Sequence, residues 1–470
     1  MTTKQWTLVV VCAATAMLML DIAVVNTALS RIAEDLDAGL AGLQWTVDAY
    51  TLAIATTVLT VGSLADRFGR RRLFTIGLAL FTLSSAACAA ASDITMLNSA
   101  RAVQGVGAAM MFAVSLAVLA HAFPGAKERA GALAAYGATI GGAFAIGPAV
   151  GGALTSGLDW QWIFLINVPL GIACLWITRA KVEESRDPAA PRVDWPGQAT
   201  LTAGLFLLVL ALLRGNEDGW GSTFIVASLA GASVLLAAFV AVEARSDHPM
   251  VPLRLFRNPS FTGAQAAAFA ISASFFAVFL YTTLYLQQVL GLSAIEAGLV
   301  YLPGTIVMFI VSGATAQLGD KVSARAMVGG GLALVAVGMA LLTLADATSS
   351  WTIVLPGSII AMIGTGLFNP SVTAVALGSV PGAQSGLAAG VNDTFRQGGI
   401  AVGVAALGAL VPAQDAFGGS ADAYVGGLQD ALWAGAALAM AGALAALWLI
   451  RMPARQQQID IPGDLVPEAA

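Results

Sequence analysis

The stretch GSLADRFGRRRL, residues 62–73, decides how the chain folds. It places one aspartate and four arginines in a short connector between two apolar runs, 45–65 and 73–92. Such a group of charges is costly to bury in hydrocarbon, whereas each run has about the 20 residues that a helix needs to cross a bilayer. The segment therefore predicts two membrane-spanning helices that are joined by a turn on one side of the membrane.

The composition of the whole chain agrees with this prediction. Of its 470 residues, 58% are hydrophobic and 10% are charged, whereas soluble domains carry about 25% charged residues. This excludes a water-soluble enzyme and a disordered chain. The net charge of -5 gives no reason to expect nucleic acid. With three scattered cysteines and two histidines, we expect no disulfide framework, no metal site and no cofactor other than protons.

Fourteen windows are long and apolar enough to span a bilayer. They are 6–29, 45–65, 73–92, 96–120, 132–156, 161–179, 197–214, 222–242, 262–288, 294–317, 325–345, 352–378, 384–411 and 428–451. The first window follows a lysine, as in a signal peptide, but Asp21 interrupts it and apolar residues continue to Leu29. We therefore expect the first window to be retained as a span.

The basic residues of the connectors predict the topology. With the N-terminus inside, the inner connectors hold 18 Lys and Arg residues, the outer ones hold Arg31 and Arg214, and Arg101 and Arg396 lie within spans. Cytoplasmic connectors are enriched in Lys and Arg, and a miscounted span would destroy this alternation. The split favours fourteen helices with both termini in the cytoplasm.

The windows divide into an N-terminal six-helix bundle, 1–180, and a C-terminal six-helix bundle, 262–451. Residues 181–261 hold two charged linkers and an inserted hairpin made of the seventh and eighth windows, and the polar tail 452–470 is expected to be disordered. We predict an all-α polytopic membrane protein. The charged segments could be ordinary linkers, but two bundles that rock about a central site are a common transporter design.

Three charges fall in the outer half of the first bundle, given the helical rise of about 1.5 Å per residue. They are Asp21, Asp48 and Arg101. Because a carboxyl group changes its proton affinity between an apolar cavity and an arginine neighbour, such a group can couple transport to protons. Alternatively, a fixed aspartate–arginine pair pins the helices together, and Asp48 lies at the water interface.

A second pair, Asp393 and Arg396, is spaced i, i+3 near the middle of the thirteenth window, beside Asn392. These residues share one helix face. Either they form an ion pair within the helix that hides both charges, or they line a central polar cavity.

Glycines mark two further segments. In the fifth window, Gly147 and Gly151 are spaced for close helix packing and Pro148 interrupts the hydrogen bonds of the helix. Gly137 and Gly141 have the same spacing.

In the connector at 62–73, Gly62 and Gly69 are expected to let the backbone turn. Asp66, Arg67 and Arg70 are expected to form a cytoplasmic latch against a neighbouring helix end. The alternative is that the arginines serve only to set the topology.

These stretches resemble motifs of the major facilitator superfamily. The connector at 62–73 is similar to its signature loop, LNSARAVQGVGAA at 97–109 to its fourth-helix motif, and GGAFAIGPAVGG at 141–152 to its antiporter motif. LDIAVVNTALS at 20–30 resembles the first-helix motif of the fourteen-helix drug:proton antiporter family. QWTVDAYTLA, WQWIFLINVPLG and NDTFRQGG also look like stretches of that family.

The resemblance implies a proton-driven exporter that works by alternating access. Proton coupling then falls to Asp21, assisted by Arg101, and the inner gate to Asp66 and Arg67. The antiporter helix carries Gly142, Gly147, Pro148, Gly151 and Gly152. The chain departs from the family pattern at Ala23, Ser30 and Gln161.

We expect small lipophilic or cationic substrates such as drugs, antibiotics or metabolites, in a cavity with apolar and aromatic walls. The candidates for its lining are Asn26, Trp45, Tyr50, Phe112, Phe275, Phe276, Tyr281, Tyr285, Asn392, Asp393 and Arg396. The aromatic residues could equally be packing or membrane-interface residues. The expected setting is a monomer in the bacterial cytoplasmic membrane.

Two other functions stay open. One is a proton-coupled importer of a nutrient or peptide on the same scaffold, which the antiporter helix argues against. The other is a membrane enzyme or sensor, for which the sequence offers neither a catalytic motif nor a sizeable soluble domain.

Overall fold

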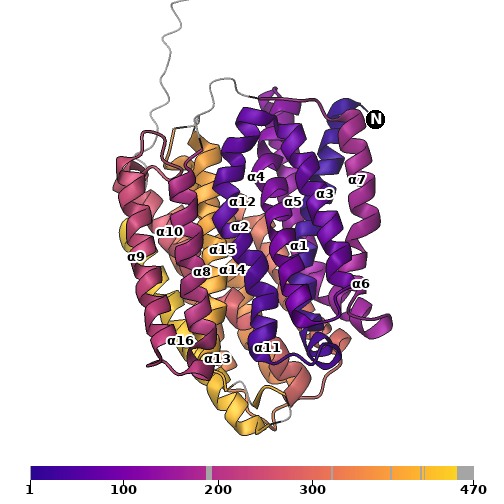
Figure 1. Ribbon diagram of the computed structural model, residues 1–470, viewed down its shortest axis with the longest axis vertical. Coiled ribbons are helices and arrows are strands. Elements are labelled where there is room, and N and C mark those ends of the chain that lie inside the picture. The colour runs from indigo at the N-terminus through magenta and orange to yellow at the C-terminus, as the bar shows by residue number, and fades with distance from the viewer. Residues whose placement is uncertain are drawn as a thin grey trace, which may run out of the picture.

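The computed structural model describes residues 2–186, 193–318, 321–381, 384–412, 415–417 and 419–451. Across these ranges the regular structure is helical, with no strand, and the long helices run along the long axis of the molecule (Figure 1). The predicted tail 452–470 lies outside the described residues.

The first part of the chain supplies six spans. They are formed by α1 (Thr3–Asp35), α2 (Leu40–Phe68), α3 (Arg70–Ala89), α4 (Ile94–Ala122), α5 (Ala126–Gly157) and the pair α6 (Trp162–Leu165) and α7 (Asn167–Lys181). Side chains begin several of these helices. For example, the Asp93 carboxylate accepts a hydrogen bond from the Met96 backbone N–H at 2.9 Å and so caps α4.

The inserted hairpin consists of α8 (Trp195–Asp218) and α9 (Thr223–Arg245). Its turn needs Gly219, because the backbone there has φ +83°. Ser222 then caps α9 through the Ile225 N–H.

The remaining helices form the second half. They are η1 (Leu253–Arg257), α10 (Pro259–Ile271), η2 (Ser272–Phe276), α11 (Ala277–Leu284), η3 (Tyr285–Val289), α12 (Ala294–Leu318), α13 (Ala324–Leu342), η4 (Trp351–Ile353), α14 (Val354–Gly378), α15 (Ser385–Gly408) and α16 (Ala421–Leu449). Between Pro259 and Val289 the span contains two π-helical stretches, η2 and η3. Such stretches are rare and occur often at functional sites.

By length and composition, thirteen helices of the described chain could cross a membrane. The one predicted span outside these thirteen is the thirteenth window, which corresponds to α15 and carries Asp393 and Arg396. Large apolar side chains point outward, among them Trp448 at 80% and Trp176 at 72% exposure. An apolar exterior of this kind requires lipid as the outer solvent.

The outer end of α1 lies further along the chain than the first window predicts. The window 6–29 underestimates α1, which continues to Asp35. At about 1.5 Å per residue, Asp21 lies about 21 Å from that end of the helix, whereas the end of the window at Leu29 would place it about 12 Å away. A helix can continue through polar residues, as α1 does between Leu29 and Asp35. A window defined by apolar residues therefore ends before the helix does.

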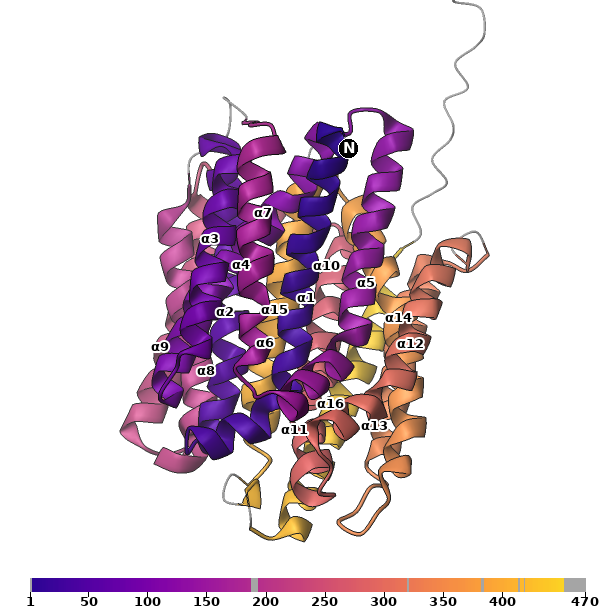
Figure 2. The same ribbon diagram turned by 90° about the vertical axis from the view of Figure 1, so that its right-hand side faces the viewer.

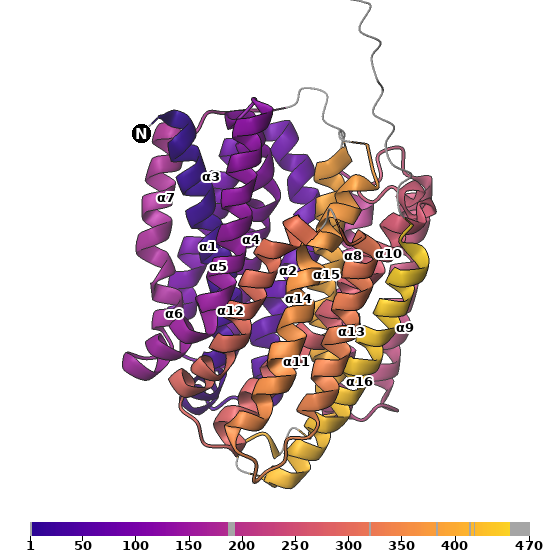
Figure 3. The same ribbon diagram turned by 180° about the vertical axis from the view of Figure 1, so that it is seen from behind.

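The helices before and after the hairpin form two groups that lie side by side. In Figure 1 the indigo and purple helices α1–α7 occupy one side, and Figure 3 shows α12, α13, α14 and α16 on the other. Figure 2 shows α5 beside α12, where the two groups meet.

The inserted helix α8 lies against both groups. Thr60 of α2 donates a short hydrogen bond to Gln198 of α8. The side chain of Asn216, also in α8, donates to the Ala409 carbonyl just after α15 at 2.6 Å. The hairpin is therefore attached to both halves of the molecule along the α2–α15 contact.

Candidate functional site

A buried ion pair occupies the interior of the first group. The Arg101 guanidinium on α4 donates a short hydrogen bond to Asp21 on α1, and both side chains are almost fully buried, at 2% and 0% exposure. Arg101 also donates to the Gln104 side chain at 2.7 Å and to the Thr46 carbonyl at 3.0 Å. The pair thus joins α1, α2 and α4.

The second carboxylate oxygen of Asp21 is also satisfied. It accepts from Gln104 at 2.9 Å and from Asn167 at 3.4 Å, and Gln104 donates onward to Ser85 at 2.8 Å. The Arg101 guanidinium stacks 4.1 Å from the centre of the Tyr50 ring. Buried ion pairs are stable only when their remaining polar atoms are satisfied in this way.

Three members of this network were missed in the sequence analysis. They are Ser85, Gln104 and Asn167. A signal was present for two of them, because Gln104 lies three residues after Arg101 on the same helix face and Asn167 falls in an apolar window.

The carboxyl group of Asp48 on α2, unlike that of Asp21, has no polar partners in the described chain. It is fully buried, and neither carboxylate oxygen has a hydrogen-bond partner among the described residues. One turn earlier, Gln44 donates to the Tyr281 hydroxyl at 2.8 Å, and this hydroxyl donates a short hydrogen bond to the Val404 carbonyl. Asp48 therefore lies at the boundary between the two groups. A buried carboxyl group without partners must be neutralised by a proton or by an incoming cation.

Of the two arrangements left open for the charges of α15, the ion pair within the helix is absent from the described residues. No ion pair or hydrogen bond joins Asp393 to Arg396 in the described part of the chain. Asn392 instead donates to Gln265 of α10 at 3.1 Å. Arg396 is half-buried, so the geometry favours a polar face with separated charges over an ion pair within the helix.

The residues predicted to line the cavity lie in several different parts of the structure. Phe275 and Phe276 pack edge to face with ring centres 5.9 Å apart, and Tyr50 belongs to the Asp21–Arg101 network. Trp45 lies 5.8 Å from the Phe206 ring of α8, so it faces the hairpin.

Three candidates are engaged elsewhere. The Tyr285 hydroxyl donates to the Asp346 carbonyl in the connector after α13 at 2.7 Å. Asn26 donates to its own helix at Ile22 at 3.2 Å. Phe112 is partly buried within α4.

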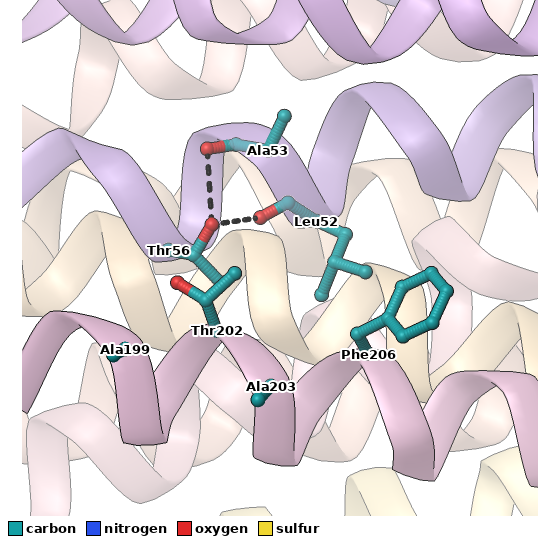
Figure 4. A pocket seen from close by; sticks show the side chains of 7 residues that line it. All are labelled: Leu52, Ala53, Thr56, Ala199, Thr202, Ala203 and Phe206. Atoms are coloured by element: carbon teal, nitrogen blue, oxygen red, sulfur yellow. Dashed lines mark hydrogen bonds between the residues drawn. The ribbon is translucent and has the colours of Figure 1, made fainter.

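An open groove lies between α2 and α8 and is shown in Figure 4. It measures about 500 Å³ and is lined by Leu52, Ala53, Thr56, Ala199, Thr202, Ala203 and Phe206. The Thr56 hydroxyl donates to the Leu52 carbonyl of its own helix at 2.9 Å, so its polar atom is satisfied locally (Figure 4). The groove is apolar and is separate from the charged residues.

The connector at 62–73 differs from its prediction at Gly62. This residue lies inside α2 and does not turn the backbone. The turn is at Gly69, whose φ of +114° favours glycine. Asp66, near the end of α2, pairs at 2.9 Å with Arg70, the first residue of α3, as expected for a contact between neighbouring helix ends. Arg67 is exposed beside the Phe68 ring.

A residue outside the predicted set holds this connector. The Glu184 carboxylate accepts from the backbone N–H groups of Arg71 at 2.9 Å and Arg72 at 3.2 Å. These groups form the N-terminus of α3, where an anion is favoured by the free N–H groups and the helix dipole. The linker after α7 is thereby attached to the turn.

The glycines of α5 face two different helices. A Cβ on Gly147 would collide with Ala23 of α1, and one on Gly151 would lie 2.7 Å from the Val24 Cα. A Cβ on Gly152 would lie 2.7 Å from the Ile295 Cα of α12. The same helix face holds Pro148, whose carbonyl contacts Gly298. The antiporter stretch thus packs α5 against both α1 and α12.

The other predicted glycines of α5 are less tightly packed. A Cβ on Gly137 would meet nothing within 4 Å, and one on Gly142 would reach only the Phe309 ring at 3.9 Å. The close approach expected at the Gly137–Gly141 pair is therefore absent at Gly137.

Replacing Gly152 by leucine is expected to separate α5 from α12, because the new side chain would meet the Ile295 backbone. Ser156 and Ile295 adjoin there, with the Ile295 N–H donating to the Ser156 hydroxyl at 3.1 Å. Cysteines placed at these two positions, after removal of the native cysteines, should form a disulfide, and Gly152→Leu should reduce its yield several-fold. Gly137→Leu is the control and should leave the yield unchanged. Equal yields in both variants would contradict the packing described.

The sequence profile of the Major Facilitator Superfamily matches residues 11–404. The chain belongs to the Major Facilitator Superfamily. Members of this superfamily are transporters, and the chain accordingly is a membrane protein with many spans.

Relatives of this chain are named for multidrug resistance or for the export of an antibiotic. The multidrug resistance protein Stp of Mycobacterium tuberculosis (strain CDC 1551 / Oshkosh) is 36% identical over 84% of this chain and 74% of its own length. The cephamycin export protein CmcT of Amycolatopsis lactamdurans is 36% identical over 86% of this chain and 84% of its own.

A solved structure shares the superfamily fold. The peptide transporter POT in complex with sulfate aligns with 94% of this chain and 95% of its own at a TM-score of 0.66 and 15% identity. This likeness concerns the fold alone.

Proposed function

We propose that the protein is a proton-driven secondary exporter of small lipophilic or cationic molecules such as drugs, antibiotics or metabolites. It lies in the bacterial cytoplasmic membrane with both termini in the cytoplasm, and acts as a monomeric transporter rather than as an enzyme. The superfamily membership and the exporter relatives support this proposal. The observation that carries it is Asp48, a buried carboxyl group without a partner at the boundary between the two groups of helices.

The two acidic residues of the first group have different roles in this proposal. Asp48 can exchange a proton without breaking any existing interaction. Asp21 must first lose Arg101, Gln104 and Asn167. We therefore assign proton binding to Asp48, and assign Asp21 a coupling role in which its network rearranges between the inward- and outward-facing states.

Protons provide enough free energy for export. One proton that crosses a potential of 100 mV releases about 2.3 kcal/mol, and each unit of pH difference adds about 1.4 kcal/mol. A single proton at 100 mV therefore supports a gradient of roughly fifty-fold. This coupling needs no bound cofactor.

The separated charges of α15 give the substrate a polar contact. Asp393 and Arg396 form no ion pair with each other, so each can meet an opposite charge or a polar atom of the substrate. Phe275 and Phe276 add an aromatic surface in the same half of the molecule. A cavity with such a surface accepts amphiphilic molecules of varied shape.

Everted membrane vesicles test the direction of transport. Vesicles are acidified inside by respiration, and a proton-gradient dye is followed while ethidium, a lipophilic cation, is added. The wild type should release protons on addition of ethidium, giving dequenching of the dye, and Asp48→Asn should not. Antibiotics named for the relatives serve as further probes. If the wild type gives no dequenching with any probe, while intact cells take up a peptide or nutrient with protons, the protein is an importer and the proposal fails.

A further inference from the structure

Two acidic residues that the transport mechanism does not use meet at one end of the inserted hairpin. Asp194 directly precedes α8 and Glu243 lies in the last turn of α9. Both side chains are more than nine-tenths buried, with Asp194 at 8% and Glu243 at 3% exposure. One thus lies at the beginning of the first hairpin helix and the other at the end of the second.

One oxygen of each carboxyl group has a backbone partner. The Asp194 Oδ1 atom accepts from the Gly197 N–H at 2.8 Å and caps α8. The Glu243 Oε2 atom accepts from the Val251 N–H at 2.9 Å. The other two oxygens, Asp194 Oδ2 and Glu243 Oε1, have no hydrogen-bond partner in the part of the chain that the structure describes.

These two unpartnered oxygens border the same space. A Cβ atom built on Gly197 would lie 2.8 Å from Glu243 Oε1 and 3.0 Å from Asp194 Oδ2. Both oxygens are therefore neighbours of a single point beside the α8 backbone. Two carboxylates facing each other at such a place cannot both be ionised without strong repulsion, and each would leave a buried acceptor unsatisfied.

No basic side chain of the described residues neutralises them. Asp194 is the charged group that acts on Glu243. The other charged or titratable side chains on the elements that pack here point to solvent, since they are exposed. They are Arg245 on α9, Asp247 and His248 on the following connector, and Arg254 and Arg257 on η1.

We propose that Asp194 and Glu243 form a proton-binding site separate from the transport pathway, in which one proton bridges Oδ2 and Oε1. The protonated carboxyl group donates its O–H to the facing carboxylate oxygen. This single proton gives both unpartnered oxygens a hydrogen bond and removes one of the two negative charges. A proton also needs no additional space between the two helices, unlike a hydrated metal ion.

The bridge holds the hairpin at its base. It joins the start of α8 to the end of α9 and, through the Val251 N–H, to the connector that leads into the second half. The folded protein holds a proton here that the unfolded chain releases at neutral pH. Linkage then requires that the free energy of unfolding falls as the pH rises, because the folded state binds more protons than the unfolded state.

The test uses the purified full-length protein and two isosteric variants, Glu243→Gln and Asp194→Asn. In each variant an amide N–H can donate to the facing carboxylate, so it replaces the bridging proton at every pH. Thermal unfolding is followed with a thiol-reactive fluorophore that reports exposure of the buried Cys88 and Cys174. Glu217→Gln changes an exposed residue of the same hairpin and serves as the control.

The wild type and Glu217→Gln should lose thermal stability together as the pH rises from mildly acidic to mildly alkaline. Glu243→Gln and Asp194→Asn should lose less, so that their unfolding midpoints exceed that of the wild type at alkaline pH. Infrared spectra should show a protonated carboxyl band in the wild type that is absent in both amide variants. The proposal is overturned if this band is unchanged in Glu243→Gln and Asp194→Asn, or if all four proteins show the same dependence of stability on pH.

Discussion

Replacing Arg101 by leucine lowers the free energy of unfolding by about 3–5 kcal/mol. The cause is the buried Asp21 carboxylate, which loses its charged partner and keeps only the neutral donors Gln104 and Asn167. Removing one member of a buried pair is costlier than removing both, because the remaining charge stays buried without compensation.

The measurement for Arg101→Leu is thermal unfolding in detergent, again reported by the buried Cys88. Asp21→Asn should destabilise less, since asparagine is neutral and can still accept hydrogen bonds from Gln104. The double variant Asp21→Asn/Arg101→Leu should recover a large part of the stability lost in Arg101→Leu. If the double variant is less stable than Arg101→Leu, the two side chains do not form an isolated ion pair, and the role assigned to Asp21 is wrong.

Replacing Asp48 by asparagine abolishes uphill export but leaves exchange of substrate across the membrane intact. The reason is that Asp48 has no partner to lose, so its neutral amide analogue keeps the packing of α2 while it removes the exchangeable proton. Substrate can then cross in both directions, but protons no longer drive it.

Proteoliposomes separate these two activities for Asp48→Asn. Counterflow, in which labelled ethidium enters against unlabelled ethidium, should persist at near wild-type rates, whereas accumulation driven by a proton gradient should fall to background. Asp430→Asn, an exposed residue of α16, is the matched control and should retain both activities. Gradient-driven accumulation by Asp48→Asn at the wild-type level would show that another group carries the proton.

The sequence predicts the helices well because lipid imposes a simple rule. Every span must be about 20 apolar residues long, so the windows follow directly from hydropathy, and the superfamily motifs then identify the fold. The errors lie at the ends of helices, where no such rule acts. Asp35 lies beyond the apolar window of α1, and Gly62 continues α2 instead of turning it.

The sequence predicts which charges lie inside the membrane but not which are paired. Asp21 and Arg101 are 80 residues apart in the chain and meet through a short hydrogen bond, whereas Asp393 and Arg396 are close in sequence and form no ion pair. Helix packing decides these pairings. For the same reason, Glu184 at the α3 N-terminus and Asp194 facing Glu243 could not be predicted, because each depends on where a connector folds back.

Protons and substrate are expected to move in opposite directions through this one protein. This opposite movement is tested most directly with the purified protein in liposomes that contain a pH-sensitive dye and no other protein, with a proton gradient imposed across the membrane. We predict that ethidium accumulates on the more acidic side, that protons leave that side in a fixed ratio to the ethidium transported, and that collapse of the gradient by a protonophore stops accumulation. Accumulation that continues without any gradient of pH or voltage, or ethidium movement without proton movement, would contradict the account.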